Sequence, residues 1–367
     1  MRNPLAAHPP WRQLMIISVL LPLMIVLAVL AFAWPAARIA PRNLPVGLVG
    51  TAPASEQVLA GLSRSDPGGF DMRVYADEGS ARSAIEDRDI YGAFVVSADG
   101  ITVLEASAAS PSVAQLLGTV GQQLARHATE RATASGSPPQ AVQVRDVDLV
   151  AAAASDPRGL VLASALLPLT ICGVIMATVI ALVLAFRPAW RQIMSLIVVS
   201  AAAGLGAYLI AQGFLGALPH NAVATWAALS LIVLAIGAAT AGLIALAGRA
   251  GLGLSVLLMI FIGNPFSGVT SAPELLPAPA GTIGQWLPPG AGASLLRSTA
   301  YFGGHGAAGP LAVLIAWIVL GLAAIAAGHH APVGFAARRA WKPSLPAGAP
   351  SGEASADRQV EAISRRI

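Results

Sequence analysis

Six long apolar runs constrain this chain more than any other feature of its sequence. They occupy residues 14–34, 161–186, 193–215, 223–247, 252–272 and 311–327. About 20 consecutive apolar residues are enough for one helix to cross a bilayer. Hydrophobic residues make up 56% of the chain and charged residues 11%, and the mean hydropathy is +0.70. The sequence therefore predicts a membrane protein with an all-α transmembrane domain of six helices.

A polar stretch, 35–158, separates the first apolar run from the other five. Apolar and alternating patterns predict strands at 44–50, 70–75, 91–96, 100–104 and 142–149. Helical spacing of apolar residues predicts helices at 55–63, 77–87 and 110–133. This β-α-β order indicates a small mixed sheet with helices packed on it. We expect an α/β domain inserted between the first and second membrane helices.

Basic residues near the ends of the apolar runs indicate how the chain is oriented. With residues 1–13 in the cytoplasm, eight basic residues lie inside: Arg2, Arg12, Arg187, Arg191, Arg249, Arg338, Arg339 and Lys342. Four lie outside: Arg38, Arg42, Arg158 and Arg297. This excess predicts cytoplasmic N- and C-termini and an extracytoplasmic α/β domain. The tail 331–367, rich in Pro, Ser, Ala and charge, is predicted to be cytoplasmic and disordered.

A signal peptide is the alternative interpretation of the run 14–34. The run is longer than a usual signal core, and it contains Pro22. It also ends in Trp34-Pro35 and not at a small-residue cleavage site. We therefore expect an uncleaved membrane helix.

The distribution of charge argues against several classes of function. The net charge is +4 and the isoelectric point is near 9.8, but 14 of the 18 acidic residues lie between Glu56 and Asp156. Such clustering reflects membrane topology and not a nucleic-acid-binding surface. The single lysine, Lys342, follows no glycine-rich loop, so the sequence has no ATPase phosphate-binding motif. We identify no catalytic residue, no metal ligand and no cofactor site, and predict that the chain is not an enzyme.

The stretch 251–302 departs most from a simple pair of membrane helices. Its apolar run breaks at Gly263-Asn264-Pro265, and two proline clusters follow before the chain becomes helical again. Non-helical backbone persists at membrane depth only when it is buried in protein or faces a water-filled cavity. The sequence therefore predicts a broken fifth helix and a re-entrant outer segment, 263–300, that forms part of a permeation path or its outer gate.

Six polar residues in or near the membrane runs are candidates for this path or gate. They are Tyr208, Gln212, Asn264, Glu274, Gln285 and Arg297. An ion pair between Glu274 and Arg297 would lower the free-energy penalty of a carboxylate near the membrane. Two interpretations stay open: these residues contact a substrate, or they cap the broken helix and hold the loop in place.

The short turn between the second and third runs is the second candidate site. It contains Arg187, Trp190 and Arg191. These residues are either a docking surface for a partner ATPase or a positive cytoplasmic anchor with an interfacial aromatic residue.

Two other patterns carry less information. Phe266-Ser267-Gly268 faintly resembles an intramembrane serine protease motif, with His220 or His305 as the base, but Pro265 replaces the expected glycine. The charged group Glu86-Asp87-Arg88-Asp89 is interpreted as a solvated helix end.

Three groups of residues resemble ABC-2-type transporter permeases, and more closely the branch that includes phage-infection-protein-like membrane proteins. The groups are 44–49 directly after the first helix, 81–85 followed by 91–96, and Gly263-Asn264-Pro265 followed by 287–290 and 296–297. The layout of one helix, a large outer domain and five further helices adds to the likeness, which covers roughly residues 10–330.

The resemblance implies a homodimeric or heterodimeric exporter that works by alternating access. ATPase subunits on the cytoplasmic loops would hydrolyse ATP, so ATP enters only through a partner. The turn 187–191 would match the coupling loop, and 273–297 the outer gate. Frequent Arg and Ala with a single lysine are typical of a GC-rich bacterial genome. Together with this composition, the resemblance implies the bacterial inner membrane.

We therefore expect the permease subunit of an exporter for a lipophilic or cell-envelope substrate. The alternative is a membrane scaffold or receptor that does not transport and whose α/β domain binds an envelope partner.

Overall fold

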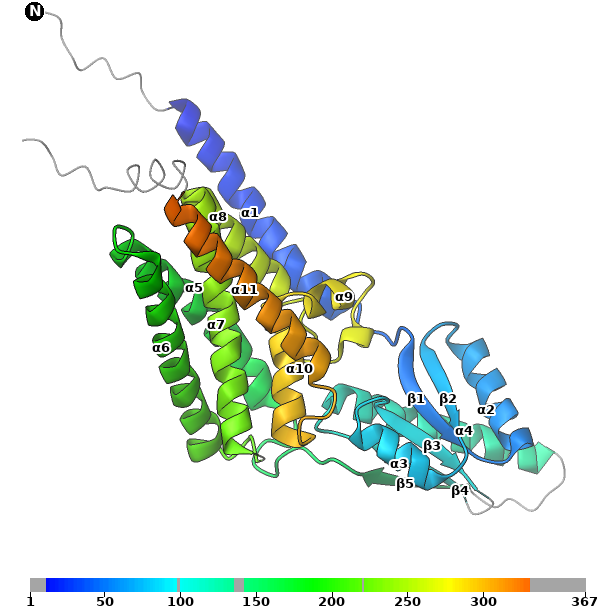
Figure 1. Ribbon diagram of the computed structural model, residues 1–367. Coiled ribbons are helices and arrows are strands. Elements are labelled where there is room, and N and C mark those ends of the chain that lie inside the picture. The colour runs from blue at the N-terminus through cyan, green and yellow to red at the C-terminus, as the bar shows by residue number, and fades with distance from the viewer. Residues whose placement is uncertain (1–10, 98–99, 135–141, 220, 331–367) are drawn as a thin grey trace, which may run out of the picture.

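The computed structural model describes residues 11–97, 100–134, 142–219 and 221–330. It consists of a helical bundle with a small α/β domain at one end (Figure 1). The predicted N-terminal segment 1–13 falls largely outside the described residues. The loop at 134–139, His220 and the tail 331–367 with Arg338, Arg339 and Lys342 also lie, wholly or largely, outside them.

Within the described residues, the bundle contains six long helices or helix pairs, one of which, α7, is central. They are α1 (Trp11–Ala37), α5 (Leu160–Val183), α6 (Ala189–Tyr208) with the π-helical segment η1 (Leu209–Phe214), α7 (Ala222–Ala247), α8 (Arg249–Val256) with the π-helical segment η2 (Leu257–Gly263), and α11 (Ala308–His330). Shorter helices join α8 to α11: η3 (Pro273–Leu275), α9 (Ala280–Gln285) and α10 (Pro288–Tyr301).

Five of these helices are long and apolar enough to cross a membrane: Ser18–Ala37, Leu160–Val183, Ala189–Phe214, Ala222–Ala247 and Ala308–Gly328. The remaining predicted span, the fifth in the chain, is shorter than expected. Its apolar helix, Arg249–Gly263, ends at the glycine, whereas the sequence predicted a broken span over 252–272. Pro265 contributes to the early end, because proline lacks the backbone N–H that would continue the helical hydrogen bonds.

The central helix α7 packs against α5, α6, α10 and α11. Small residues let it approach α11 closely, as a Cβ added at Gly321 would lie 2.3 Å from the carbonyl carbon of Ala238. A Cβ at Gly242 would lie 2.7 Å from the Gly321 carbonyl oxygen. Within a membrane the hydrophobic effect does not drive helices together, so close van der Waals packing between small residues stabilises their contact.

Helix α1 lies along the outside of the bundle (Figure 1). Its apolar side chains are mostly exposed, which suits a surface facing lipid. It packs lightly on η2, and the Trp34 and Phe266 rings meet edge to face with centroids 6.2 Å apart.

The α/β domain is a five-stranded sheet with helices packed on it. Its strands are β1 (Leu44–Val49), β2 (Phe70–Tyr75), β3 (Gly92–Val96), β4 (Gly100–Glu105) and β5 (Gln143–Asp148). Its helices are α2 (Ala52–Ser65), α3 (Glu78–Glu86) and α4 (Pro111–Ala134). The strand order is β2-β1-β3-β4-β5, and only the pair β3–β4 is antiparallel. The predicted mixed sheet is confirmed.

The sheet lies between two membrane helices in the chain, because α1 leads into β1 and the segment after β5 leads into α5. Leu44, Val46 and Leu48 of β1 pack with Phe94 and with Leu117 of α4 in its core. The buried residues of α3 and of the start of β3 instead face the bundle. They belong to the bundle's largest hydrophobic cluster. The two parts therefore meet over a continuous packed surface.

Candidate functional site

The break in the fifth apolar run is built by the sequence Gly263-Asn264-Pro265. The helix α8 first widens into η2, and π-helical segments are often found at functional sites. After the break, the Ser267 hydroxyl donates to the Asn264 carbonyl at 2.6 Å, and the Ser267 N–H donates to the same oxygen at 3.2 Å. These bonds turn the chain sharply out of the helix.

Asn264 lies at the centre of this break and is 7% exposed. Among the residues that the structure describes, its Nδ2 amide has no hydrogen-bond partner. A buried polar group without a partner is destabilising by about 1–3 kcal/mol. Asn264 is thus a candidate residue with an unused hydrogen-bond donor at the break of a membrane helix.

Gln285 joins the two sides of the interrupted segment. Its Nε2 donates to the Ser267 carbonyl at 2.9 Å, and its Oε1 accepts from the Ser294 hydroxyl of α10 at 2.7 Å. Glycines allow this close return, since a Cβ at Gly284 would lie 1.7 Å from the Phe266 carbonyl oxygen. For Gln285, the geometry favours the interpretation that it holds the loop in place.

Arg297 is buried on α10, with 7% of its surface exposed. Its Nη2 donates to the Val269 carbonyl in the loop after the break. The expected ion pair with Glu274 is not formed between these two described residues, since Glu274 binds elsewhere. The guanidinium therefore ties α10 to the loop through a neutral carbonyl.

Glu274 connects the interrupted segment to the α/β domain. Its Oε2 accepts a hydrogen bond from the Tyr91 hydroxyl at 2.8 Å. Burial, and then the charge of Glu274, raise the pKa of Tyr91, so the phenol stays protonated and donates to the carboxylate. Glu274 therefore helps to hold the domain against the bundle.

Arg88 forms the largest polar contact between the α/β domain and the bundle. Its Nη1 donates to the Ser294 carbonyl at 3.0 Å and to the Ser298 hydroxyl of α10. Its guanidinium carbon also lies 5.1 Å from the centre of the Phe302 ring. Burial lowers the pKa of Arg88. The acids Glu86, Asp87 and Asp89 are exposed, as predicted for a solvated helix end, whereas Arg88 between them is half-buried.

The neighbouring Asp87 adds a second contact, with the loop that follows α10. Its Oδ1 lies 2.6 Å from Nδ1 of His305, and both side chains are about half exposed. Arg88 itself has a left-handed backbone, with φ at 66°, which is uncommon for a residue other than glycine. The conformation aims its side chain at α10, and the sequence carries no signal of it.

Three further hydrogen bonds join the α/β domain and residues 40–42, which follow α1, to the segment after the break. The Leu275 carbonyl of η3 accepts from the Ala40 N–H at 3.0 Å and from Arg42 Nη1 at 2.9 Å. Further along, the Ser112 hydroxyl of α4 donates to the Thr270 carbonyl at 3.3 Å. The segment 264–287 is thus held on one side by α10 and on the other by the α/β domain. We call the contacts of the α/β domain and of residues 40–42 with the segment 264–287, with α10 and with His305 the junction.

Tyr208 and Gln212, the other two candidates, lie apart from the break, at the end of α6 and in η1, before the loop that leads to α7. Gln212 Oε1 accepts from the Leu218 N–H at 2.7 Å and closes the turn after η1. Tyr208 ends α6 and packs partly into the bundle core. The Tyr301 hydroxyl of α10 donates to the Ala217 carbonyl, so this loop reaches the junction only indirectly.

The turn with Arg187, Trp190 and Arg191 lies at the end of the bundle away from the α/β domain (Figure 1). Trp190 is 61% exposed, and the guanidinium of Arg191 lies 5.4 Å from the centre of its ring. This exposed cationic and aromatic surface suits either a protein partner or the membrane interface.

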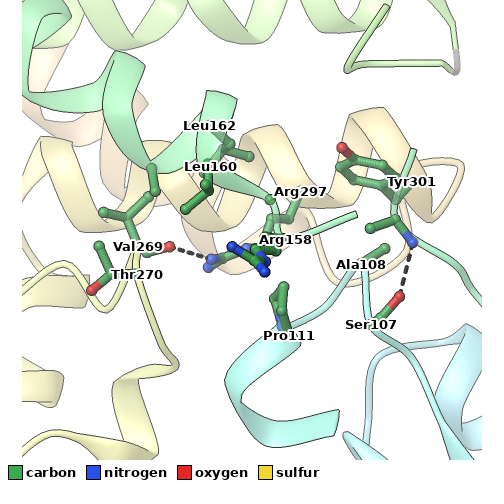
Figure 2. Close-up of a pocket in the computed structure, with 13 residues that line it drawn as sticks. Ser107, Ala108, Pro111, Arg158, Leu160, Leu162, Val269, Thr270, Arg297 and Tyr301 are labelled. Atoms are coloured by element: carbon green, nitrogen blue, oxygen red, sulfur yellow. Dashed lines mark hydrogen bonds between the residues drawn. The ribbon is translucent and has the colours of Figure 1, made fainter. Parts of the chain in front are cut away.

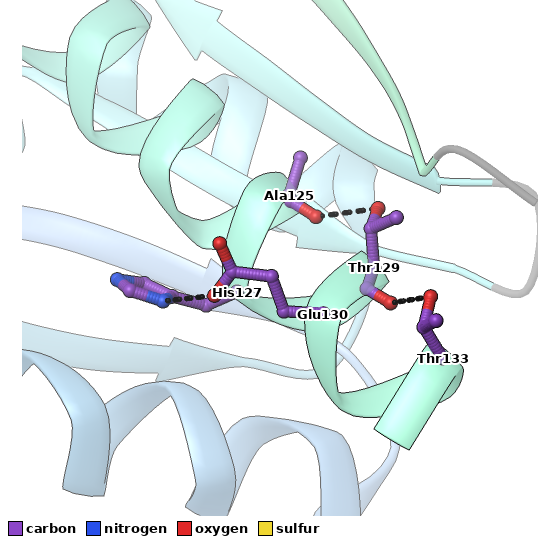
Figure 3. Close-up of polar contacts among 5 residues, drawn as sticks. All are labelled: Ala125, His127, Thr129, Glu130 and Thr133. Atoms are coloured by element: carbon purple, nitrogen blue, oxygen red, sulfur yellow. Dashed lines mark hydrogen bonds and ion pairs between the residues drawn. The ribbon is translucent and has the colours of Figure 1, made fainter. Parts of the chain in front are cut away.

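The serine protease pattern finds no support in the geometry. The Ser267 hydroxyl is bound to the Asn264 carbonyl, and His305 is bound to Asp87. His220 lies outside the described residues. The polar contacts along α4 are also local, since His127 and Glu130 pair at 3.3 Å on an exposed face (Figure 3).

Within the described part of the chain, no group of three or more His, Cys, Asp or Glu side chains could hold a metal ion. Comparison with family models, with curated proteins and with solved structures found no match for this chain.

Proposed function

We propose that this chain is the membrane-spanning permease subunit of an ABC-type exporter that moves a lipophilic or cell-envelope substrate. It would work by alternating access as a dimer, with separate ATPase subunits. The observation that carries the proposal is the broken helix at Asn264, whose buried amide has no partner within the described residues. Interrupted helices with polar groups at the break are typical of substrate sites in transporters.

In this proposal the membrane is crossed six times, and the fifth crossing is composite. The helix Arg249–Gly263 would enter from the cytoplasmic side, and α10 would complete the path to the outer side. The basic turn at Arg187 and Arg191 lies away from the α/β domain, which agrees with cytoplasmic termini and an outer domain. A bacterial inner membrane is the location that this arrangement implies.

The junction gives the proposed permease a means of linking its outer domain to its path. Arg88 binds α10, and Tyr91 binds Glu274 next to η3. A movement of the segment 264–287 would therefore be transmitted to the α/β domain. We propose that this segment is the outer gate and that the domain steadies it.

The alternative is a scaffold or receptor that does not transport. It is favoured by Gln285 and Arg297, whose hydrogen bonds hold the loop in place. The α/β domain also carries two surface grooves of about 390 and 530 Å³, beside α4 and β5, that could accept an envelope partner. The two proposals differ in whether an ATPase binds the cytoplasmic turn.

The test is purification of the tagged full chain from its native membrane in mild detergent, followed by mass spectrometry and an ATP hydrolysis assay. The exporter proposal predicts a stoichiometric ATPase subunit that is lost in the double variant Arg187→Gln/Arg191→Gln. The matched control is Arg126→Gln/Arg145→Gln, which removes the same charge from exposed sites on the α/β domain. An envelope protein bound without any ATPase would replace the exporter proposal with the scaffold.

A second variant tests the site itself. Asn264→Ala removes a buried amide nitrogen that has no described partner, so the thermal stability of the protein should not fall. Transport-coupled ATP hydrolysis by the complex should nevertheless fall. Unchanged hydrolysis with normal stability would exclude Asn264 from the substrate path.

A further inference from the structure

A small cavity lies where the α/β domain, the start of α5 and α10 meet (Figure 2). Its volume is about 60 Å³. This is room for a few water molecules or for one tetrahedral oxyanion. Two arginines, Arg158 and Arg297, line it together, and Figure 2 shows both side chains reaching into the same space.

The two guanidinium groups differ in how they are held. Arg297 is buried, and its Nη2 donates to the Val269 carbonyl, which is an uncharged acceptor. Arg158 is exposed on the loop before α5, and no hydrogen bond from its side chain is found among the described residues. A guanidinium has five N–H donors in a planar fork, so both arginines keep donors for another group.

Asp156, two residues before Arg158, already has hydrogen-bond partners. Asp156 accepts from the Leu160 and Val161 N–H groups at 2.8 Å each and caps the start of α5. Tyr301 contributes its ring to the cavity wall, but its hydroxyl donates to the Ala217 carbonyl. The cavity therefore has positive side chains on its wall and no carboxylate among its lining residues.

The remaining wall is largely apolar. Leu160, Leu162 and Val269 line it, and Leu160 is the first residue of the membrane helix α5. Lipid headgroups lie at the ends of membrane helices, and basic pockets at that level bind anionic headgroups. Arginine is well suited to phosphate because its fork matches two oxygens at once.

We propose that this cavity binds a phosphate group between Arg158 and Arg297, supplied by an anionic phospholipid. The headgroup phosphate lies in the cavity, and the acyl chains run along the apolar surface of α5. Because Arg297 also holds the Val269 loop, a bound lipid steadies the junction from the membrane side. This site requires neither an ATPase nor transport, so it stands apart from the proposed exporter function.

Native mass spectrometry of the purified full chain in detergent tests this site, with phosphatidylglycerol, phosphatidylcholine and inorganic phosphate as separate probes. Arg158→Gln is the deciding variant, because its side chain is exposed and makes no described hydrogen bond. Loss of one charge-assisted phosphate contact should weaken phosphatidylglycerol binding about tenfold. Arg297→Gln should weaken it to a similar extent, and Arg158→Lys should restore part of the binding.

Arg38→Gln is the matched control, since Arg38 is an exposed arginine at the end of α1 and does not line the cavity. Wild-type preference for phosphatidylglycerol over phosphatidylcholine, lost in Arg158→Gln but kept in Arg38→Gln, supports the site. Equal phosphatidylglycerol binding by all three proteins overturns it. Binding of inorganic phosphate that depends on Arg158, with no gain from the lipid, keeps the phosphate site but overturns the lipid as its source.

Discussion

The contact between α7 and α11 and the junction hold the molecule together by opposite means. Between α7 and α11, glycines bring two backbones together, with no room for a Cβ at Gly321. At the junction, charged and polar side chains such as Arg88 and Glu274 bind backbone and hydroxyl groups. Close apolar packing gives one rigid arrangement, whereas a set of hydrogen bonds can be exchanged for others. We infer that the first region is a scaffold and that the second can move.

The largest expected effect is at Gly321. Gly321→Leu forces the side chain into the Ala238 backbone, so the two helices must separate. We expect a loss of at least about 3 kcal/mol in the free energy of unfolding in mixed micelles. Gly206→Leu is the matched control, because a Cβ there meets nothing within 4 Å and the residue is exposed. Equal stability of the two variants would contradict the account of α7 and α11.

The next largest effect is at Arg88. Arg88→Ala removes the donor to Ser294 and Ser298 and the stacking on Phe302. We expect a loss of about 2–3 kcal/mol, measured by thermal unfolding of the purified protein. Arg82→Ala on α3, the helix that ends just before Arg88, is the control, since its ion pair with Glu78 contributes less than about 1 kcal/mol. A loss at Arg88 no greater than at Arg82 would mean that the junction is weak.

Much of this architecture could be predicted from the sequence, but the junction could not. The membrane helices follow from length and apolar content, and the strands from apolar patterning, because both signals are local. Arg88 contacts Ser294 of α10, which lies 206 positions away in the sequence. Nothing in the acid-rich stretch around Arg88 indicates its left-handed backbone conformation. The unpartnered amide of Asn264 depends likewise on what surrounds it. Proline and asparagine together marked the break, but not the residues that would bind across it.

A smaller effect is expected for the pair Tyr91 and Glu274. A double-mutant cycle with Tyr91→Phe and Glu274→Gln should give a coupling free energy of about 1.5 kcal/mol, since the hydroxyl donates to a carboxylate. Unfolding in mixed micelles measures it. Tyr75→Phe combined with Glu274→Gln is the reference cycle and should be additive. Additivity in the first cycle as well would show that the contact contributes nothing.

The smallest effect concerns pH and the α/β domain. Burial, and then the charges of Asp148 and Asp146, raise the pKa of Glu105 to about 7. The folded carboxyl binds its proton more tightly than the unfolded one, whose pKa is 4.5. The stability due to Glu105 is therefore complete below about pH 4.5 and is lost as the pH rises through about 7. Glu105→Gln should therefore be more stable than wild type at pH 8 and not at pH 4. A melting-temperature series checks this, and exposed Glu56→Gln should run parallel to wild type.

Hydrogen–deuterium exchange of the full chain in lipid nanodiscs distinguishes a movable segment 264–287 from the rigid packing of α7 on α11. If the segment 264–287 is a movable gate on a rigid scaffold, its amides should exchange at least about 100-fold faster than those of 232–242 in α7. Arg88→Ala should speed exchange in 264–287 further and leave 232–242 unchanged. Equal protection of the two segments, or a variant that speeds both alike, would contradict the division into scaffold and gate.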